Sequence, residues 1–164
     1  MATEPGWGRC SPSPTGPFAG SPWRRDKGAL WDLGPHVLSL ALPVLGPVER
    51  VTAGTGYGDT VHLVLGHAGG ASSTLTMSQT VPVAATHVGL QVWGPEGRSA
   101  TPPFELAHLD AMGEAIRQLT ATVAAGATTH PCDVRLGRDI VAVLEAAERF
   151  LSAAPATRAA AVAG

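Results

Sequence analysis

Residues 74–81 read TLTMSQTV, a pattern that already restricts the fold. Apolar and polar side chains alternate, so an extended segment here has one apolar face and one hydroxyl-rich face. A period of two predicts a β-strand with one face on a core and the other in polar surroundings. The apolar set is Leu75, Met77 and Val81, and the polar set is Thr74, Thr76, Ser78 and Thr80.

Two further stretches repeat this alternation on the N- and C-terminal sides. Residues 60–66 place Val61, Leu63 and Leu65 on one face, and residues 86–94 do the same with Val88, Leu90 and Val92. Glycine-rich sequences typical of turns join the stretches at residues 54–59, 68–70 and 94–97. With residues 48–53 added, the sequence predicts a mostly antiparallel meander of four or more strands.

Helical patterns flank the strands. Residues 32–36 (DLGPH) are predicted to open a helix, with Gly34 at the N-cap and Pro35 at the first helical position. Residues 104–125 and a segment capped by Asp133 predict two more helices. The expected buried stripes are Leu33, Val37, Leu40, Ala41 and Val44 in the first helix; Leu109, Met112, Ile116, Leu119 and Val123 in the second; and Leu136, Ile140, Val143, Leu144, Ala147 and Leu151 in the third.

Segregated strands and helices predict an α+β fold, a mostly antiparallel open sheet with helices packed on one face. We expect a flexible Pro/Gly/Ser-rich leader at residues 1–22, one domain at 23–153 and an Ala-rich tail at 154–164. The uncovered sheet face would show Thr74, Thr76, Ser78, Thr80, His87, Gln91 and Trp93. Such a face stands in water or pairs with a copy of itself, and we favour a homo-oligomer formed through it.

Composition narrows the function classes. The chain has 164 residues, 45% of them hydrophobic, and a net charge of -2, which favours neither nucleic acid nor an anionic membrane as partner. The apolar run at residues 37–45 is too short to span a bilayer. Cys10 and Cys132 suggest no disulfide framework, and His62 and His67 should point to opposite sheet faces, so no metal site is predicted. We expect a cytoplasmic protein with reduced thiols.

Asp32 and His36 are the main candidate catalytic residues in the sequence. Four residues apart near a helix start, they can share one face, where a carboxylate orients an imidazole and makes it a better proton acceptor. Such a pair suits general acid–base catalysis. The alternative is an aspartate that only stabilises the helix start beside an incidental surface histidine.

Residues 21–38 (SPWRRDKGALWDLGPHVL) resemble the Gly-Gly-x-Leu-x-Asp-x-Gly-x-His motif of the C-terminal domain in the glucose–fructose oxidoreductase / inositol dehydrogenase / MocA (Gfo/Idh/MocA) family. The predicted order of helices and strands over residues 21–153 is also similar to that of this C-terminal domain. The resemblance implies that His36 is the acid/base or hydroxyl-binding residue and Asp32 its orienting partner. It also makes Trp23 and Arg24 candidate substrate contacts.

The chain departs from the family pattern in several places. Gly28 alone remains of the glycine run, Ser39 stands where an aspartate is frequent, and Lys27 is the only lysine, so the family's catalytic lysine segment is missing. The N-terminal Rossmann domain, which would bind NAD or NADP, is not in this sequence. The glycines of residues 54–58 lack the Gly-x-Gly-x-x-Gly spacing and read as a hairpin turn, so no cofactor-binding residue is predicted.

Three functions follow as hypotheses. The first is the substrate-binding and catalytic half of an NAD(P)-dependent oxidoreductase that acts on a secondary alcohol of a sugar or polyol. This half is inactive without a Rossmann domain, which belongs either to a longer parent chain or to a separate polypeptide. The second is a non-catalytic dimerisation or ligand-binding module derived from that family. The third, weaker one is a cofactor-independent isomerase or hydrolase that uses Asp32 and His36.

Overall fold

A computed structural model describes residues 22–80, 88–101 and 108–153. The elements are α1 (Pro22–Leu45), β1 (Val48–Thr55), β2 (Val61–His67), β3 (Ser72–Met77), β4 (Gln91–Gly94), β5 (Gly97–Ala100), α2 (His108–Ala124) and α3 (Val134–Ala153). Helices and antiparallel strands are segregated, so the predicted α+β class is confirmed. The predicted leader apart from Pro22, the predicted tail, and the predictions for Cys10, Val81 and His87 lie outside the described residues.

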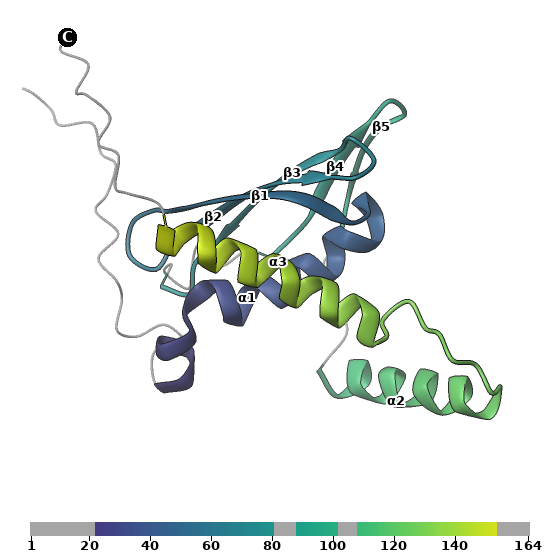
Figure 1. The fold of residues 1–164 in the computed structure, drawn as a ribbon. Coiled ribbons are helices and arrows are strands. Elements are labelled where there is room, and N and C mark those ends of the chain that lie inside the picture. Colours follow the sequence, from purple (N-terminus) through teal and green to yellow (C-terminus); the bar gives the residue numbers. More distant parts are fainter. Residues whose placement is uncertain (1–21, 81–87, 102–107, 154–164) are drawn as a thin grey trace, which may run out of the picture.

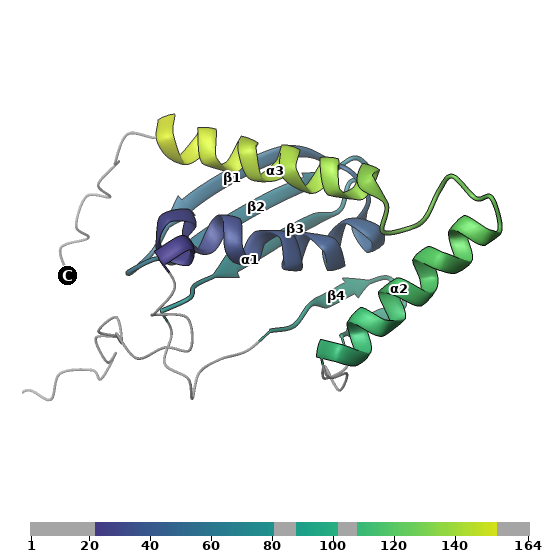
Figure 2. The same ribbon diagram turned by 90° about the horizontal axis from the view of Figure 1, so that it is seen from below.

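The main sheet is antiparallel with strand order β1-β2-β3. Its alternation is the predicted one: Val61, Leu63 and Leu65 of β2 and Leu75 and Met77 of β3 are all buried. Helices α1 and α3 lie side by side across this face (Figures 1 and 2) and complete the core. On the opposite face, described side chains of β2 and β3 such as Val64 and Thr76 are exposed, as predicted for an open sheet.

Helix α3 follows its prediction closely. The Asp133 carboxylate accepts hydrogen bonds from the backbone N–H of Arg135 at 2.8 Å and of His130 at 3.3 Å, which makes it the N-cap. The apolar stripe packs on the sheet and α1: Ile140, Val143, Leu144 and Ala147 are buried, and Leu136 and Leu151 border the core. At the helix surface, Trp31 Nε1 of α1 donates to Glu148 of α3 at 3.2 Å.

Helix α1 differs from the prediction. It begins at Pro22, bends at Gly28 (φ 67°, ψ 177°) and continues through Gly34 and Pro35, so Gly34 is not an N-cap. The predicted stripe is also partly wrong, because Val44 is 59% exposed while the core takes Ala29, Leu30, Leu38, Ala41 and Leu42. Proline and glycine normally interrupt helices, and here packing against α3 and the sheet overrides that local preference.

Strands β4 and β5 form a separate two-stranded ribbon. The turn at residues 94–97 is as predicted, since Gly94 pairs with Gly97 across it. The expectation of a single meander of four or more strands is wrong for the described residues, because β4 pairs with β5, which the alternation did not reveal. Val88 and Leu90 precede β4 and are not in a strand.

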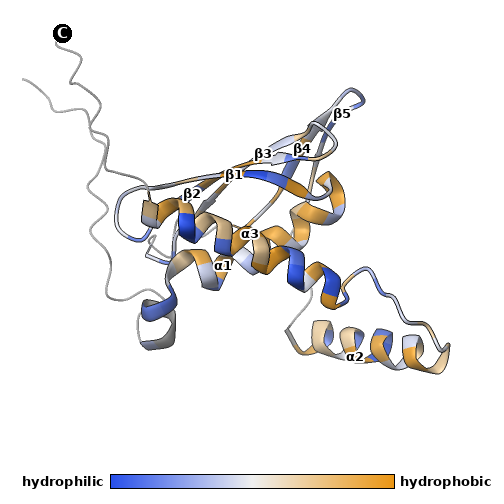
Figure 3. Cartoon of the chain, in the orientation of Figure 1, coloured by the Kyte–Doolittle hydropathy of each residue, from blue (hydrophilic) through white to orange (hydrophobic). Residues whose placement is uncertain are grey.

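Helix α2 forms as predicted, but its apolar stripe is not buried. It makes no extended contact with any other described element, and Figures 1 and 2 show it set apart from the α1–α3 layer. In Figure 3 much of its ribbon has the orange of hydrophobic residues, and Leu109, Met112, Ile116, Leu119 and Val123 are exposed. The stripe that should have contributed to the core is therefore open to solvent.

The segment Asp26–Leu45 is long and apolar enough to cross a membrane by length and composition. A core helix of a globular protein passes the same test. Here Leu38 and Ala41 are completely buried between the sheet and α3, which accounts for the apolar character of the segment.

Candidate functional site

The motif Asp32-x-Gly34-x-His36 occupies the part of α1 that follows the bend at Gly28. The positive φ of Gly28 is a conformation that glycine adopts without strain, and it sets the direction in which the motif helix starts. The side chains of the motif have different surroundings. Asp32 is buried at 9% exposure, Gly34 is buried, and His36 is exposed.

The Asp32 carboxylate is held by a residue distant in sequence. Gln79 Nε2 donates to Asp32 Oδ2 at 2.6 Å, which joins α1 to the segment that follows β3. A buried carboxylate needs such a donor, because burial without hydrogen bonds costs several kcal/mol. This bond fixes one turn of α1 relative to the end of the sheet.

Asp59, in the β1–β2 turn, holds the segment that carries Gln79. Its carboxylate accepts from Ser78 Oγ at 2.6 Å, Thr80 Oγ1 at 2.7 Å and the Gln79 backbone N–H at 2.8 Å. Burial raises the pKa of Asp59, but these hydrogen bonds outweigh it and leave the pKa below its ordinary value of 3.8. Asp59 therefore positions Gln79, which in turn positions Asp32.

Gly34 gives the motif a second anchor. A Cβ atom at this position would lie 2.5 Å from Leu144 Cδ2 of α3 and 3.8 Å from Met77 Sδ of β3. Glycine therefore fits here without displacing Leu144, because α1 and α3 approach closely at this point. The glycine of the motif is explained by helix packing, independently of any ligand.

His36 stands one helical turn beyond Asp32, on the solvent side. Ser39 Oγ donates to the His36 carbonyl oxygen at 2.7 Å, a local bond within the helix. Trp23 and Arg24 lie in the first turns of α1, before the bend; the structure describes their backbone. The roles of His36, Asp32, Trp23 and Arg24 stay predictions.

Sequence reasoning missed Gln79 and Asp59. Both are polar residues at the ends of strands: Gln79 lies within the Ser-Gln-Thr run after β3, and Asp59 follows the glycine turn. The alternation predicts Ser78 and Thr80 on the polar face of a longer strand and assigns no role to Gln79 between them. Its pairing with α1 depends on contacts far apart in the chain.

The glycine-rich residues 54–58 do not form a Rossmann-type dinucleotide site. Residues 54–58 belong to the end of β1 and the tight turn into β2, where the Gly56 N–H bonds the Thr60 carbonyl at 2.8 Å. No helix follows that turn to receive a pyrophosphate. Within residues 22–80, 88–101 and 108–153, no group of three or more His, Cys, Asp or Glu could hold a metal ion. Of the histidine pair, His62 is exposed and His67 is buried at 4% exposure, on opposite faces as predicted.

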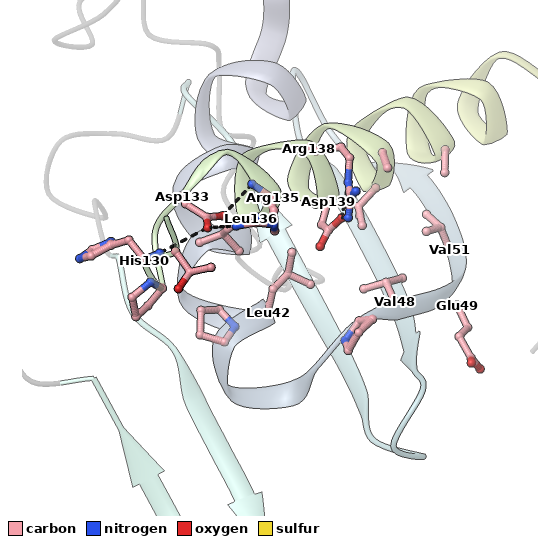
Figure 4. A pocket seen from close by; sticks show the side chains of 17 residues that line it. Leu42, Val48, Glu49, Val51, His130, Asp133, Arg135, Leu136, Arg138 and Asp139 are labelled. Carbon is pink, nitrogen blue, oxygen red and sulfur yellow. Dashed lines mark hydrogen bonds and ion pairs between the residues drawn. The ribbon is translucent and has the colours of Figure 1, made fainter. Parts of the chain in front are cut away.

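A cavity of about 940 Å³ lies elsewhere, among β1, the C-terminal end of α1 and the start of α3 (Figure 4). Its apolar wall includes Leu42, Val48 and Leu136. Four of its charged groups form two pairs, Arg135 with Asp133 at 2.6 Å and Arg138 with Asp139 at 2.7 Å, and Glu49 also lines it. Neither Asp32 nor His36 lines this cavity, so it is separate from the motif.

The fold is shared with part of a known oxidoreductase. A crystal structure of an oxidoreductase from Agrobacterium radiobacter in complex with NAD+, L-tartaric acid and magnesium matches with a TM-score of 0.52 and 23% sequence identity. The match covers 74% of this chain and 46% of the oxidoreductase chain. The present chain therefore spans about half the length of that enzyme. No curated protein matches the sequence.

The sequence itself assigns the family. Residues 7–100, more than half of the 164-residue chain, match the family model of the GFO/IDH/MocA C-terminal domain. The chain belongs to this family. The resemblance drawn from residues 21–38 is thus confirmed, and the chain is an oxidoreductase-family module.

Proposed function

We propose that this chain is the substrate-binding and catalytic half of an NAD(P)-dependent oxidoreductase that acts on a secondary alcohol of a sugar or polyol. Oxidation of such an alcohol removes a proton from the hydroxyl group and a hydride from its carbon. His36 accepts the proton as general base, and Asp32 is its positioning residue. The protein works in the cytoplasm.

One observation carries this proposal. The buried Asp32 carboxylate and the close Gly34–Leu144 contact fix the helical turn from which the exposed His36 projects. A residue that meets a substrate has to be reachable from solvent and yet held by a rigid element. His36 combines both properties. The hydrogen bonds from Asp59 to the Gln79 backbone and from Gln79 to Asp32 hold this turn against the end of the sheet.

The substrate contacts and the cofactor complete the proposal. Trp23 and Arg24, before the bend at Gly28, supply an aromatic face and a cation for a small polar ligand. The L-tartaric acid named for the Agrobacterium enzyme is a small hydroxylated molecule of this kind. Since the glycine-rich residues 54–58 form no Rossmann-type dinucleotide site, NAD or NADP is bound by a Rossmann domain outside the described residues, and this chain alone is inactive.

The open sheet face supports a homo-oligomer. Exposed side chains of β2 and β3 line this face, among them His62, Val64 and Thr76, with His62 Nδ1 and Thr76 Oγ1 3.0 Å apart. A broad uncovered sheet offers the same patch to both partners of a two-fold contact. The alternative function is a dimerisation or ligand-binding module without catalysis, to which the same open sheet face would belong.

Binding and activity assays separate these functions. Titration calorimetry of NADH and NADPH against this chain should show no binding, and tight binding would refute the division of the site between two domains. Mixed with the family's dinucleotide-binding half, the chain should give NAD(P)-dependent oxidation of polyols. A complex that assembles, binds cofactor and still oxidises no sugar, polyol or hydroxy acid would support the non-catalytic alternative.

A further inference from the structure

The surface with the least explanation is the apolar stripe of α2. Its side chains are 60–85% exposed, although all five belong to types that are normally buried: Leu109, Met112, Ile116, Leu119 and Val123. No described element covers them. In proteins most of the stability of a helix comes from packing of its apolar face, so a partner on this stripe would stabilise the 17-residue helix α2.

The spacing of the stripe indicates what kind of surface it fits. The intervals are three, four, three and four residues, which is the narrow a/d seam of a coiled coil. By contrast, α3 has a wider stripe with the adjacent pair Val143 and Leu144, and this stripe packs on a sheet and a second helix. The stripe of α2 therefore suits one partner helix rather than a sheet.

The residues beside the seam suit a partner of the same kind. The flanking positions at Gly113, Ala115, Thr120 and Thr122 are small and uncharged, so two such helices can approach without repulsion between like charges. The charges of the helix lie away from the seam. Among them, Glu114 is already bonded to Arg117 of its own helix at 2.5 Å.

We propose that α2 is a dimerisation helix, which pairs with α2 of a second copy of this chain. The partner has to present a narrow, uncharged apolar seam on an accessible helix, and in the part of the chain that the structure describes α2 itself does so. Figures 1 and 2 show α2 set apart from the α1–α3 layer, and the α2 ribbon in Figure 3 carries the orange of hydrophobic residues over much of its length. This pairing is independent of the catalytic role of His36 and uses a different element from the open sheet face.

Substitutions on the two sides of α2 test the proposal. In sedimentation velocity over about a hundredfold range of concentration, Ile116→Glu with Leu119→Glu should weaken self-association at least about 100-fold, because it buries charges in the seam. Ala111→Glu with Ala121→Glu adds the same charge on the outer face of α2. This variant should have a dissociation constant within about threefold of the wild-type value. A wild-type chain that stays monomeric throughout, including one that binds only a different polypeptide, would overturn the proposal.

A cross-link identifies the contact even if the charged variant loses helix α2. Residue 116 is the midpoint of the seam, so it meets its own copy in a parallel or an antiparallel pair. In a chain with Cys10→Ser and Cys132→Ser, Ile116→Cys should form a disulfide-linked dimer on mild oxidation, and Ala121→Cys should not. If the chain associates but Ile116→Cys forms no cross-link, and if Ile116→Glu with Leu119→Glu leaves the association unchanged, the contact lies elsewhere and the pairing of α2 is refuted.

Discussion

The packing of Gly34 against α3 gives a quantitative prediction. In Gly34→Ala the new Cβ would lie 2.5 Å from Leu144 Cδ2, whereas carbon atoms in contact are about 3.5–4.0 Å apart. Leu144 is 1% exposed, so its side chain moves about 1 Å within a filled core or the two helices separate. Overpacking of this kind costs about 1–3 kcal/mol, and the better helix propensity of alanine returns up to about 1 kcal/mol. If alanine returns about 1 kcal/mol, the net loss should be about 0–2 kcal/mol, so Gly34→Ala should not stabilise the protein.

Urea unfolding monitored by circular dichroism measures this loss, and α3 offers a matched control. A Cβ at Gly137 meets nothing within 4 Å, so Gly137→Ala should stabilise the protein by up to about 1 kcal/mol through propensity alone. In a Leu144→Ala background, which itself costs about 2–5 kcal/mol, Gly34→Ala should become neutral or stabilising. If Gly34→Ala stabilises the wild-type protein as much as Gly137→Ala does, the close approach of α1 and α3 is refuted.

Three further predictions concern single side chains. Because the pKa of Asp59 is lowered in the folded protein, the stabilisation by its hydrogen bonds is complete above pH 3.8 and is lost as the pH falls below that value. Asp59→Asn should therefore reduce the acid-dependent part of the unfolding free energy. An unchanged dependence of the unfolding free energy on pH would contradict this. His67 bonds the Gly46 carbonyl at 2.8 Å and Ser73 Oγ at 2.9 Å, so His67→Phe should cost about 1–3 kcal/mol in urea unfolding, and a neutral result would show that these bonds contribute little. His36→Ala should change stability by less than about 0.5 kcal/mol, because the side chain is exposed; a larger loss in thermal unfolding would indicate a structural role.

The elements predicted correctly are those whose signal lies within a short stretch of sequence. The alternation of Leu63 and Leu65 with polar neighbours, and the Asp133 cap before a wide apolar stripe, each fix an element within a few residues. Both were confirmed. The family was also recognised from a short motif, because its Asp, Gly and His have a fixed spacing.

The predictions that failed involve partners distant in sequence. Helix α1 runs through Gly34 and Pro35 because α3 packs on it, and the helix-breaking signals of these residues were read without that contact. The α2 stripe reads as core by periodicity, yet periodicity does not say which surface covers it. Gln79 has the parity of the apolar residues Leu75 and Met77 in the predicted strand and was not singled out, and only its bond to Asp32 reveals its position in the site.

The turnover rate of an enzyme assembled from this chain and the family's dinucleotide-binding half, with and without His36→Gln, tests the proposed chemistry most directly. Loss of a general base should lower kcat by about 10²–10⁴-fold, with cofactor binding and unfolding free energy unchanged. If the His36→Gln enzyme turns over its alcohol substrate as fast as the wild type, the imidazole on α1 does not move the hydroxyl proton.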